Sequence, residues 1–280
     1  MKNTLSIDVE DYYHVSGLKS VIPKENWDTY PQRVVENTRK ILHIFDAYNV
    51  KATFFILGIV AEKHPELVEG IHKAGHEVAS HGYGHELVYE QTESQFRQDL
   101  LRSKRILEEI TGEPVLGYRA PSFSIVQTTP WALDVLLELG FRYDSSIYPI
   151  QHDRYGIPHA ERTPHVVHSN GKDVLWEFPP CTYRVIGKNI PMAGGGYFRF
   201  FPYRLTKACL RSLNKRGLSA MVYLHPWELD PDQPQFKPEL KNRFRHYINL
   251  DKTESRLIQL VQDFPFTTIV AVFRKLEGKR

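Results

Sequence analysis

The sequence predicts an α/β fold built as a (β/α) barrel, and two observations carry that prediction. Four or five times along the chain, a strand-like apolar run is followed by a polar loop and then by a helical pattern. This alternation indicates a parallel sheet. The first strand is not followed by the G-x-G-x-x-G pattern of a doubly wound dinucleotide fold, so a barrel is the better prediction.

The expected elements follow from apolar periodicity and from helix and turn signals. Strands are expected at 4–9, 51–57, 76–80, 115–118, 141–144 and 219–224, with a last one near 267–269. Helices are expected at 31–49, 61–74, 129–140, 202–215 and 252–263, and after Thr92, where Thr92 and Gln95 form a capping-box pattern. Residues 150–200 are expected to form an elaborated loop region with short strands at 166–168 and 174–178, and residues 230–250 an irregular basic and aromatic stretch.

Composition narrows the class of protein. The net charge of +3 is modest and not clustered, so no nucleic-acid partner is expected. The two cysteines make no disulfide framework. The N-terminus has no apolar core after its lysine, and no run of about 18 apolar residues could form a transmembrane segment, so a cytoplasmic protein is expected. With no repeat, low-complexity segment or linker in 280 residues, a single domain is expected.

One loop stands out because it places two imidazoles close together. In Ser80-His81-Gly82-Tyr83-Gly84-His85, two glycines argue against a helix, where each would cost about 1 kcal/mol. The segment therefore indicates a loop after a strand, able to turn His81 and His85 onto one metal ion. With thirteen histidines in the chain, a chance pair is common, so this pair alone does not establish a site.

Polar clusters follow five of the expected strands. They are Asp8–Asp11, the His81/His85 pair, Arg119, Asp144 and His225. In a parallel barrel the carboxyl ends of all strands open on one face, so the clusters are expected to converge there.

The converging groups suit hydrolysis of an amide or ester. A carboxylate with two histidines gives a three-ligand metal site that keeps open positions. A spare carboxylate beside it could act as base on a metal-bound water, and His225 could protonate a leaving group. An arginine close to the base would hold it ionised.

Five ordered motifs resemble those of the polysaccharide deacetylases (NodB-like, carbohydrate esterase family 4). They are Ser-Ile-Asp-Val-Glu-Asp, Ser-His-Gly-Tyr-Gly-His, Tyr-Arg-Ala-Pro-Ser, Tyr-Asp-Ser-Ser and Tyr-Leu-His-Pro, and they span roughly residues 5–228. Within that family the chain most resembles the branch found with exopolysaccharide and exosortase (PEP-CTERM) loci. Gly-Gly-Gly-Tyr-Phe-Arg, His-Pro-Trp-Glu and Arg-Phe-Arg-His-Tyr look typical of that branch.

The resemblance implies a distorted barrel of seven or eight strands, with residues from about 230 to 280 as a family-specific extension of a domain over 1–280. It implies removal of N-acetyl groups from a polysaccharide or oligosaccharide, association with membrane-bound exopolysaccharide machinery, and a divalent metal, usually zinc. By position, the resemblance assigns these roles: base, Asp8; metal ligands, His81 and His85; arginine paired with the base, Arg119; catalytic acid, His225; carboxylate orienting that acid, Asp144.

The first motif departs from the family's usual pair of adjacent aspartates, because this chain has Asp-Val-Glu-Asp. Strand alternation puts Glu10 on the face of Asp8. A tight turn after Val9 could bring in Asp11 instead, and Asp11 is favoured because aspartate is the family's usual ligand. A backbone N–H near Tyr83 or Gly84 is expected to stabilise the oxyanion.

Substrate contacts are assigned to Tyr83, Pro121 and Trp227, although aromatic side chains more often belong to a core. The glycines 194–196 form either a simple turn or a backbone that approaches a sugar. Two rival functions stay open: an amidohydrolase for a small cyclic amide such as allantoin, and a non-catalytic carbohydrate-binding barrel. The intact histidine pair favours the deacetylase over the first, and the presence of Asp8 and His225 favours it over the second.

Overall fold

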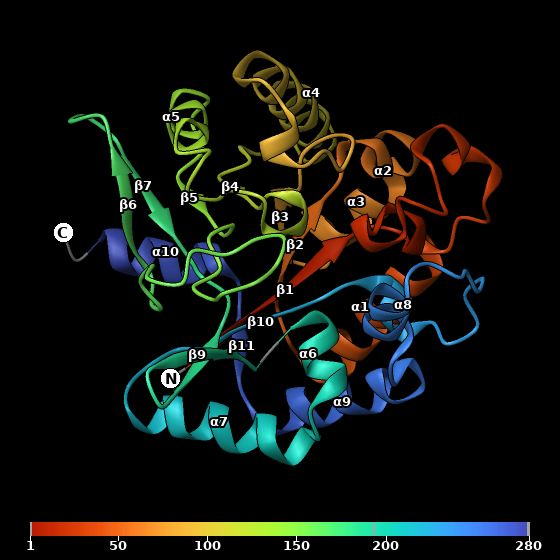
Figure 1. The fold of residues 1–280 in the computed structure, drawn as a ribbon. Coiled ribbons are helices and arrows are strands. Elements are labelled where there is room, and N and C mark those ends of the chain that lie inside the picture. The colour runs from red at the N-terminus through yellow and green to blue at the C-terminus, as the bar shows by residue number, and fades with distance from the viewer. Residues whose placement is uncertain (1, 193, 279–280) are drawn as a thin grey trace.

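The chain folds around one curled sheet with helices outside it, in a computed structural model that describes residues 2–192 and 194–278 (Figure 1). The strands of this sheet are β1 (Asn3–Val9), β2 (Thr53–Ile56), β3 (Glu77–Ser80), β4 (Gly117–Tyr118), β5 (Tyr143–Asp144), β6 (His165–Ser169), β7 (Val174–Glu177), β10 (Met221–Leu224) and β11 (Phe266–Thr267). Their order is β10-β1-β2-β3-β4-β5-β7-β6, with β11 pairing additionally with β1. A separate hairpin consists of β8 (Thr182–Val185) and β9 (Lys188–Pro191).

The helices surround this sheet, with α4 and α5 near the top of Figure 1 and α7 and α9 near the bottom. Their bounds are α1 (Val34–Ala47), α2 (Gly58–Lys63), α3 (Pro65–Lys73), α4 (Glu93–Thr111), α5 (Trp131–Glu138), α6 (Gly195–Phe200), α7 (Tyr203–Lys215), α8 (Leu240–Tyr247), α9 (Thr253–Asp263) and α10 (Ile269–Glu277). Short 3-10 turns include η1 (Tyr12–His14), η2 (Ser16–Leu18), η3 (Lys24–Thr29), η4 (Val88–Glu90), η5 (Pro121–Phe123), η6 (Pro226–Leu229) and η7 (Leu250–Lys252).

The predicted α/β architecture with a parallel sheet is confirmed. Every pair from β10 through β1 and β2 to β5 and β7 is parallel, and only β6 runs antiparallel, at the edge. The curled sheet does not continue as a ladder from β7 to β10 within the described residues. A backbone hydrogen bond from Cys181 N to Met221 O (3.0 Å) connects the two sides there.

Strand β1 explains how the sheet separates its two faces. All seven of its residues are buried, and successive side chains point to opposite faces. Leu5, Ile7 and Val9 belong to the main hydrophobic core. Ser6 and Asp8 point the other way, into the curl, where both meet Arg119. The interior of the curl is therefore polar where the strands end, and the apolar core lies between the sheet and the helices.

Three segments differ from the sequence prediction. The expected helix 61–74 is divided into α2 and α3, because Pro65 has no N–H to donate back to the preceding turn. The stretch at 230–250 contains helix α8.

The strand expected near 267–269 is wrong in part. The chain leaves β11 after Thr267 and enters α10, which Thr268 caps by accepting from Ala271 N. The β-branched run that opens α10 is typical of a strand, so this helix was missed. No helix in residues 2–192 and 194–278 is both long and apolar enough to cross a bilayer.

Candidate active site

The carboxyl ends of the parallel strands open into a cavity of about 360 Å³. Its deep part is lined by Asp8, Glu10, His81 and His85, while residues 152–155 and helix α8 contribute to its outer part. A cavity of this volume is within the range that holds small ligands. The shared polarity of the strands thus brings three of the predicted clusters, Asp8–Asp11, the His81/His85 pair and His225, to one cavity, and Arg119 joins them through Asp8. Asp144 is not part of the cavity lining.

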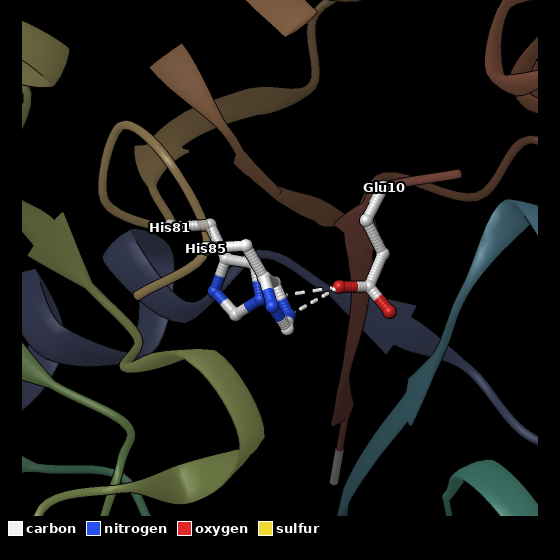
Figure 2. Close-up of side chains that lie close together, drawn as sticks. All are labelled: Glu10, His81 and His85. Carbon is white, nitrogen blue, oxygen red and sulfur yellow. Dashed lines mark ion pairs between the residues drawn. The ribbon is translucent and has the colours of Figure 1, made fainter. Parts of the chain in front are cut away.

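Glu10, His81 and His85 form a compact cluster in which both imidazoles point at one carboxylate oxygen (Figure 2). The distances to Glu10 Oε2 are 2.7 Å from His85 Nε2 and 4.0 Å from His81 Nε2. His81 Nδ1 donates to the carbonyl oxygen of Arg119 at 2.8 Å, so its Nε2 is the nitrogen left with a lone pair. Within the described part of the chain, this is the group of three histidine, cysteine or acidic side chains placed to hold a metal ion.

The protonation of this cluster suits a metal ion. Burial by itself would raise the pKa of Glu10, but His85, His225 and His81 hold that pKa below its ordinary range. Burial lowers the pKa of His81 to about 4. A carboxylate facing a neutral imidazole is the state in which these groups bind divalent metals. The chemistry of the donor set therefore fits a divalent ion such as zinc.

Unusual backbone conformations and one half-buried acid shape the histidine loop. Gly82 has φ +75°, and His85 adopts a φ of +56°, which is rare for a residue with a side chain. Asp99 on α4 accepts hydrogen bonds from Tyr83 N (2.7 Å) and Gly84 N (3.2 Å). Tyr83 N and Gly84 N thus donate to Asp99, so the expected oxyanion contact from a backbone N–H near Tyr83 or Gly84 would have to replace one of these hydrogen bonds or use a neighbouring amide.

The favoured carboxylate ligand, Asp11, is not in the cluster, and Glu10 takes its place. The Asp11 carboxylate accepts from Tyr12 N (3.0 Å), Arg33 N (2.6 Å) and Val34 N (2.9 Å). It therefore caps the start of α1, where backbone N–H groups lack partners inside the helix. The alternation of β1 continues one residue further, which keeps Glu10 on the face of Asp8.

Asp8 lies beside the cluster and forms the expected pair with Arg119. The Arg119 guanidinium is fully buried and reaches Asp8 Oδ1 through Nη1 at 2.5 Å. Its other nitrogens donate to the Ser145 side chain and backbone carbonyl, which fixes the plane of the guanidinium. The second oxygen of Asp8 lies 3.8 Å from His225 Nε2. Asp8 thus lies between a buried guanidinium and the imidazole of His225.

Each ring nitrogen of His225 faces a carboxylate. Neither carboxylate is that of Asp144, the partner expected from the sequence. Its Nδ1 hydrogen-bonds to Glu228 Oε1 at 2.6 Å, and its backbone N donates to the same oxygen at 3.0 Å. Its Nε2 faces Glu10 at 3.6 Å. Burial by itself would lower the pKa of His225, but Glu10 and Glu228 raise it to about 9.

Glu228 is in turn fixed by Arg199, and the sequence prediction missed both residues. Arg199 Nε donates to Glu228 Oε2 at 2.5 Å, and both side chains are buried. The remaining Arg199 nitrogens donate to the carbonyl oxygens of Arg245, His246 and Ile248 at the end of α8. The acid three residues after His225 in His-Pro-Trp-Glu was the available signal for Glu228.

Asp144 pairs with a different acid, Glu177 of the adjacent strand β7. The two are opposite each other in the parallel ladder and both are completely buried. Burial raises the pKa of Asp144 to about 6, and burial next to Asp144 raises the pKa of Glu177 well above its ordinary range. Asp144 also accepts from Ser146 Oγ. With both pKa values raised, at least one of the two carboxyl groups is favoured in its protonated form. None of the hydrogen bonds or ion pairs of the described residues joins Asp144 to His225.

Of the three residues assigned to substrate contact, Trp227 lines the cavity, whereas Tyr83 and Pro121 are absent from its lining. Trp227 Nε1 donates to Glu10 Oε1 at 3.1 Å, so the indole also positions the carboxylate. Tyr83 packs under Arg102 and donates to Glu62.

The glycines 194–196 belong to the start of α6 and pass close to the cavity. A Cβ on Gly194 would lie 2.0 Å from the Tyr223 ring, so only glycine fits at that position. Gly195 and Gly196 line the cavity, which keeps open the expectation of a backbone that approaches a sugar.

Comparisons with known proteins divide the chain in two. Residues 25–143 match the polysaccharide deacetylase family, and residues 145–274 match a family described as a domain of unknown function (DUF3473). The first match contains His81, His85 and Arg119, whereas His225, Glu228 and α8 fall in the second. Strand β1 precedes both matches, yet it pairs with β10 from the second.

Among curated proteins, the chain is 36% identical over 108 residues to a peptidoglycan deacetylase of Helicobacter pylori, covering 39% of this chain and 36% of that protein. It is 35% identical over 101 residues to a peptidoglycan-N-acetylglucosamine deacetylase of Bacillus cereus, covering 36% and 37% of the two chains. The chain thus spans a little over a third of the length of these relatives.

Solved structures resemble the fold over nearly the whole chain. A putative polysaccharide deacetylase from Mycobacterium smegmatis superposes with a TM-score of 0.62 at 22% identity, covering 99% of this chain and 91% of that one. Puue allantoinase gives a TM-score of 0.60 at 19% identity, covering 98% and 88%. At such identities the likeness concerns the fold alone.

Proposed function

We propose that this chain, whose residues 25–143 match the polysaccharide deacetylase family, is a metal-dependent hydrolase that removes N-acetyl groups from amino sugars of a glycan. The observation that carries the proposal is one cavity in which a Glu10–His81–His85 cluster, the Asp8–Arg119 pair and the His225–Glu228 pair all meet. Amide hydrolysis needs these three functions close together: a metal site, a base and an acid.

The ligands that we assign to the metal are Glu10 Oε2 and the Nε2 atoms of His81 and His85, and the metal that we assign is zinc. A divalent ion held there would act as a Lewis acid and lower the pKa of a water molecule towards about 7. Three protein ligands leave coordination positions open, as catalytic zinc sites require. Trp227 and Arg119 support the site, because one donates to Glu10 and the carbonyl oxygen of the other orients His81.

Asp8 serves as the base that accepts the proton of the attacking water. Its buried salt bridge with Arg119 fixes the orientation of the carboxylate. Asp8 Oδ2 lies 3.8 Å from His225 Nε2. The base and the acid are therefore close enough to act on the same amide group, the base on the attacking water and the acid on the leaving nitrogen.

His225 serves as the acid that protonates the departing sugar amine. Hydrogen bonding of Nδ1 to Glu228 favours the doubly protonated ring and leaves Nε2–H directed into the cavity. Glu228 thus takes the orienting role that the sequence resemblance assigned to Asp144.

The glycan that we propose is an exopolysaccharide or its precursor, and the support for it is the resemblance of the sequence motifs.

We also propose that residues 1–280 act as one domain, with residues 230–280 as its extension. The pairing of β1 with both β10 and β11 supports this, because segments from both ends of the chain share one sheet.

The test is acetate release from N-acetylglucosamine oligomers by metal-stripped protein, with zinc or cobalt added back. We expect release to return with metal, to be lost in His81→Ala, and to persist in His43→Ala, a control at an exposed histidine of α1. Release from the stripped protein at the full rate would overturn the metal assignment. Turnover of allantoin without acetate release would favour the amidohydrolase instead.

A further inference from the structure

The outer part of the cavity carries positive charge from a region with no assigned role. Arg154 from the loop 152–155, and Lys241 and Arg245 from α8, all line the cavity. These three residues lie within 145–274, the part of the chain matched to a domain of unknown function. Lys241 and Arg245 belong to the basic and aromatic stretch at 230–250, and the proposed deacetylase chemistry does not use their charges.

The acids of the cavity do not neutralise these cations. Asp8 is paired with Arg119, and Glu10 with His85, deep in the site. At the rim, Lys241 and Arg245 share one acid, Asp153. Arg154 forms no ion pair with any residue in 2–192 or 194–278, and its side chain is exposed. The rim therefore carries excess positive charge facing the place where a substrate would lie.

Aromatic side chains accompany these charges. Tyr155, Tyr197, Phe200 and Phe244 line the same cavity. Phe200 and Phe244 are 51% and 55% exposed, and their ring centroids lie 6.1 Å apart. Large apolar rings left exposed at the mouth of a cavity are typical of a ligand contact. Aromatic faces beside guanidinium groups suit a ligand that is both a sugar and an anion.

We propose that the substrate of this site is an acidic glycan, in which the N-acetyl sugar lies next to a carboxylate or phosphate group bound by Arg154, with Lys241 and Arg245 adding to the attraction. The guanidinium fork can hold two oxygens of such an anion at once, whereas a neutral N-acetylated chain offers it no charge partner. This inference rests on the proposed deacetylase function and specifies its substrate class.

The experiment measures binding and turnover separately for three probes. They are a neutral N-acetylglucosamine tetramer, a tetrasaccharide that alternates glucuronate with N-acetylglucosamine, and N-acetylglucosamine 1-phosphate. Dissociation constants come from calorimetry on metal-loaded and metal-stripped protein, so that binding of the anion to the metal is recognised. The variants are Arg154→Gln and the double variant Arg154→Gln/Arg245→Gln. Arg184→Gln is the control, at an arginine that is exposed on β8 and outside the cavity lining.

We expect at least one acidic probe to bind tighter than the neutral tetramer, and its dissociation constant to rise roughly threefold to tenfold in Arg154→Gln. The double variant should lose more, Arg184→Gln nothing, and higher salt should weaken the acidic probe selectively. Which acidic probe prevails distinguishes a carboxylate from a phosphate.

Equal binding of neutral and acidic probes, or acidic binding that is unchanged in both variants, would overturn the inference. Acetate release decides the proposed function independently. If tight acidic binding depends on Arg154 but no probe loses acetate, the deacetylase proposal fails and the anion site stands.

Discussion

Replacing Glu228 by glutamine tests how the pKa of His225, the acid that we propose, is controlled. Glu228 accepts two hydrogen bonds from His225, from Nδ1 at 2.6 Å and from the backbone N at 3.0 Å. Glutamine keeps the size of the side chain but removes the negative charge that favours the protonated ring. The pKa of His225 should therefore fall from its raised value of about 9.

The magnitude follows from the strength of the lost contact. A hydrogen bond to a charged group contributes about 1.5–3 kcal/mol, and one pKa unit corresponds to about 1.4 kcal/mol. The pKa of His225 should fall by about one to two units. If His225 is the acid, as we propose, it must carry its proton, so the alkaline limb of the pH–rate profile should move down by the same amount. At pH values well above the original limb this lowers kcat/KM about tenfold to a hundredfold.

The assay is the initial rate of acetate release between pH 6 and 10, with an NMR titration of His225 in the metal-free protein. Asp144→Asn is the matched control, because Asp144 was the partner expected from sequence and hydrogen-bonds to Ser146 instead. Its alkaline limb should stay in place. An unmoved limb in Glu228→Gln, or an equal shift in Asp144→Asn, would refute the reasoning.

Three further predictions concern the residues that shape the site. Asp11→Ala should leave the bound metal content unchanged in elemental analysis but lower the free energy of unfolding by about 1–3 kcal/mol, because three backbone N–H groups lose their acceptor. Gly82→Ala should weaken metal affinity, measured by competition with a chelator, because φ is +75° and the new Cβ would lie 2.8 Å from Asp99 Oδ2. Glu177→Gln should reduce the fall in the free energy of unfolding between pH 5 and pH 8, measured by denaturant unfolding. The folded pKa of Glu177 is raised, so the stability that its proton contributes declines as pH rises from the ordinary pKa towards the raised one.

Each of these predictions has its own contrary result. Loss of metal in Asp11→Ala with unchanged stability would return Asp11 to the ligand set. Wild-type metal affinity in Gly82→Ala would mean that the loop does not depend on its backbone conformation. A pH dependence of unfolding that is identical in Glu177→Gln would exclude the raised pKa of Glu177.

The sequence by itself located the central parallel strands and most of the helices, and it indicated that Asp8, His81, His85, Arg119 and His225 would lie near one another. Apolar periodicity located the strands β1, β2, β3 and β10 to within a few residues. The residues of the site follow those strands, and parallel strands share one polarity, so their polar ends had to converge. The sequence alone therefore predicted that His81, His85 and Arg119 lie near one another, without knowledge of any contact.

Only the tertiary structure decided between neighbouring candidates. Glu10 and Asp11 are adjacent in sequence, and the choice depended on α1, whose first backbone N–H groups bind Asp11. Glu228 and Asp144 are both acids after strands, and the turn η6 brings Glu228 under His225, while β7 places Glu177 against Asp144. Hydrogen bonds form over about 3 Å, and which side chain lies within that reach is set by the packing of segments distant in sequence. The positive charge at the outer part of the cavity also depends on tertiary structure. Arg154 and helix α8 are distant in sequence, and they line one cavity only in the folded chain.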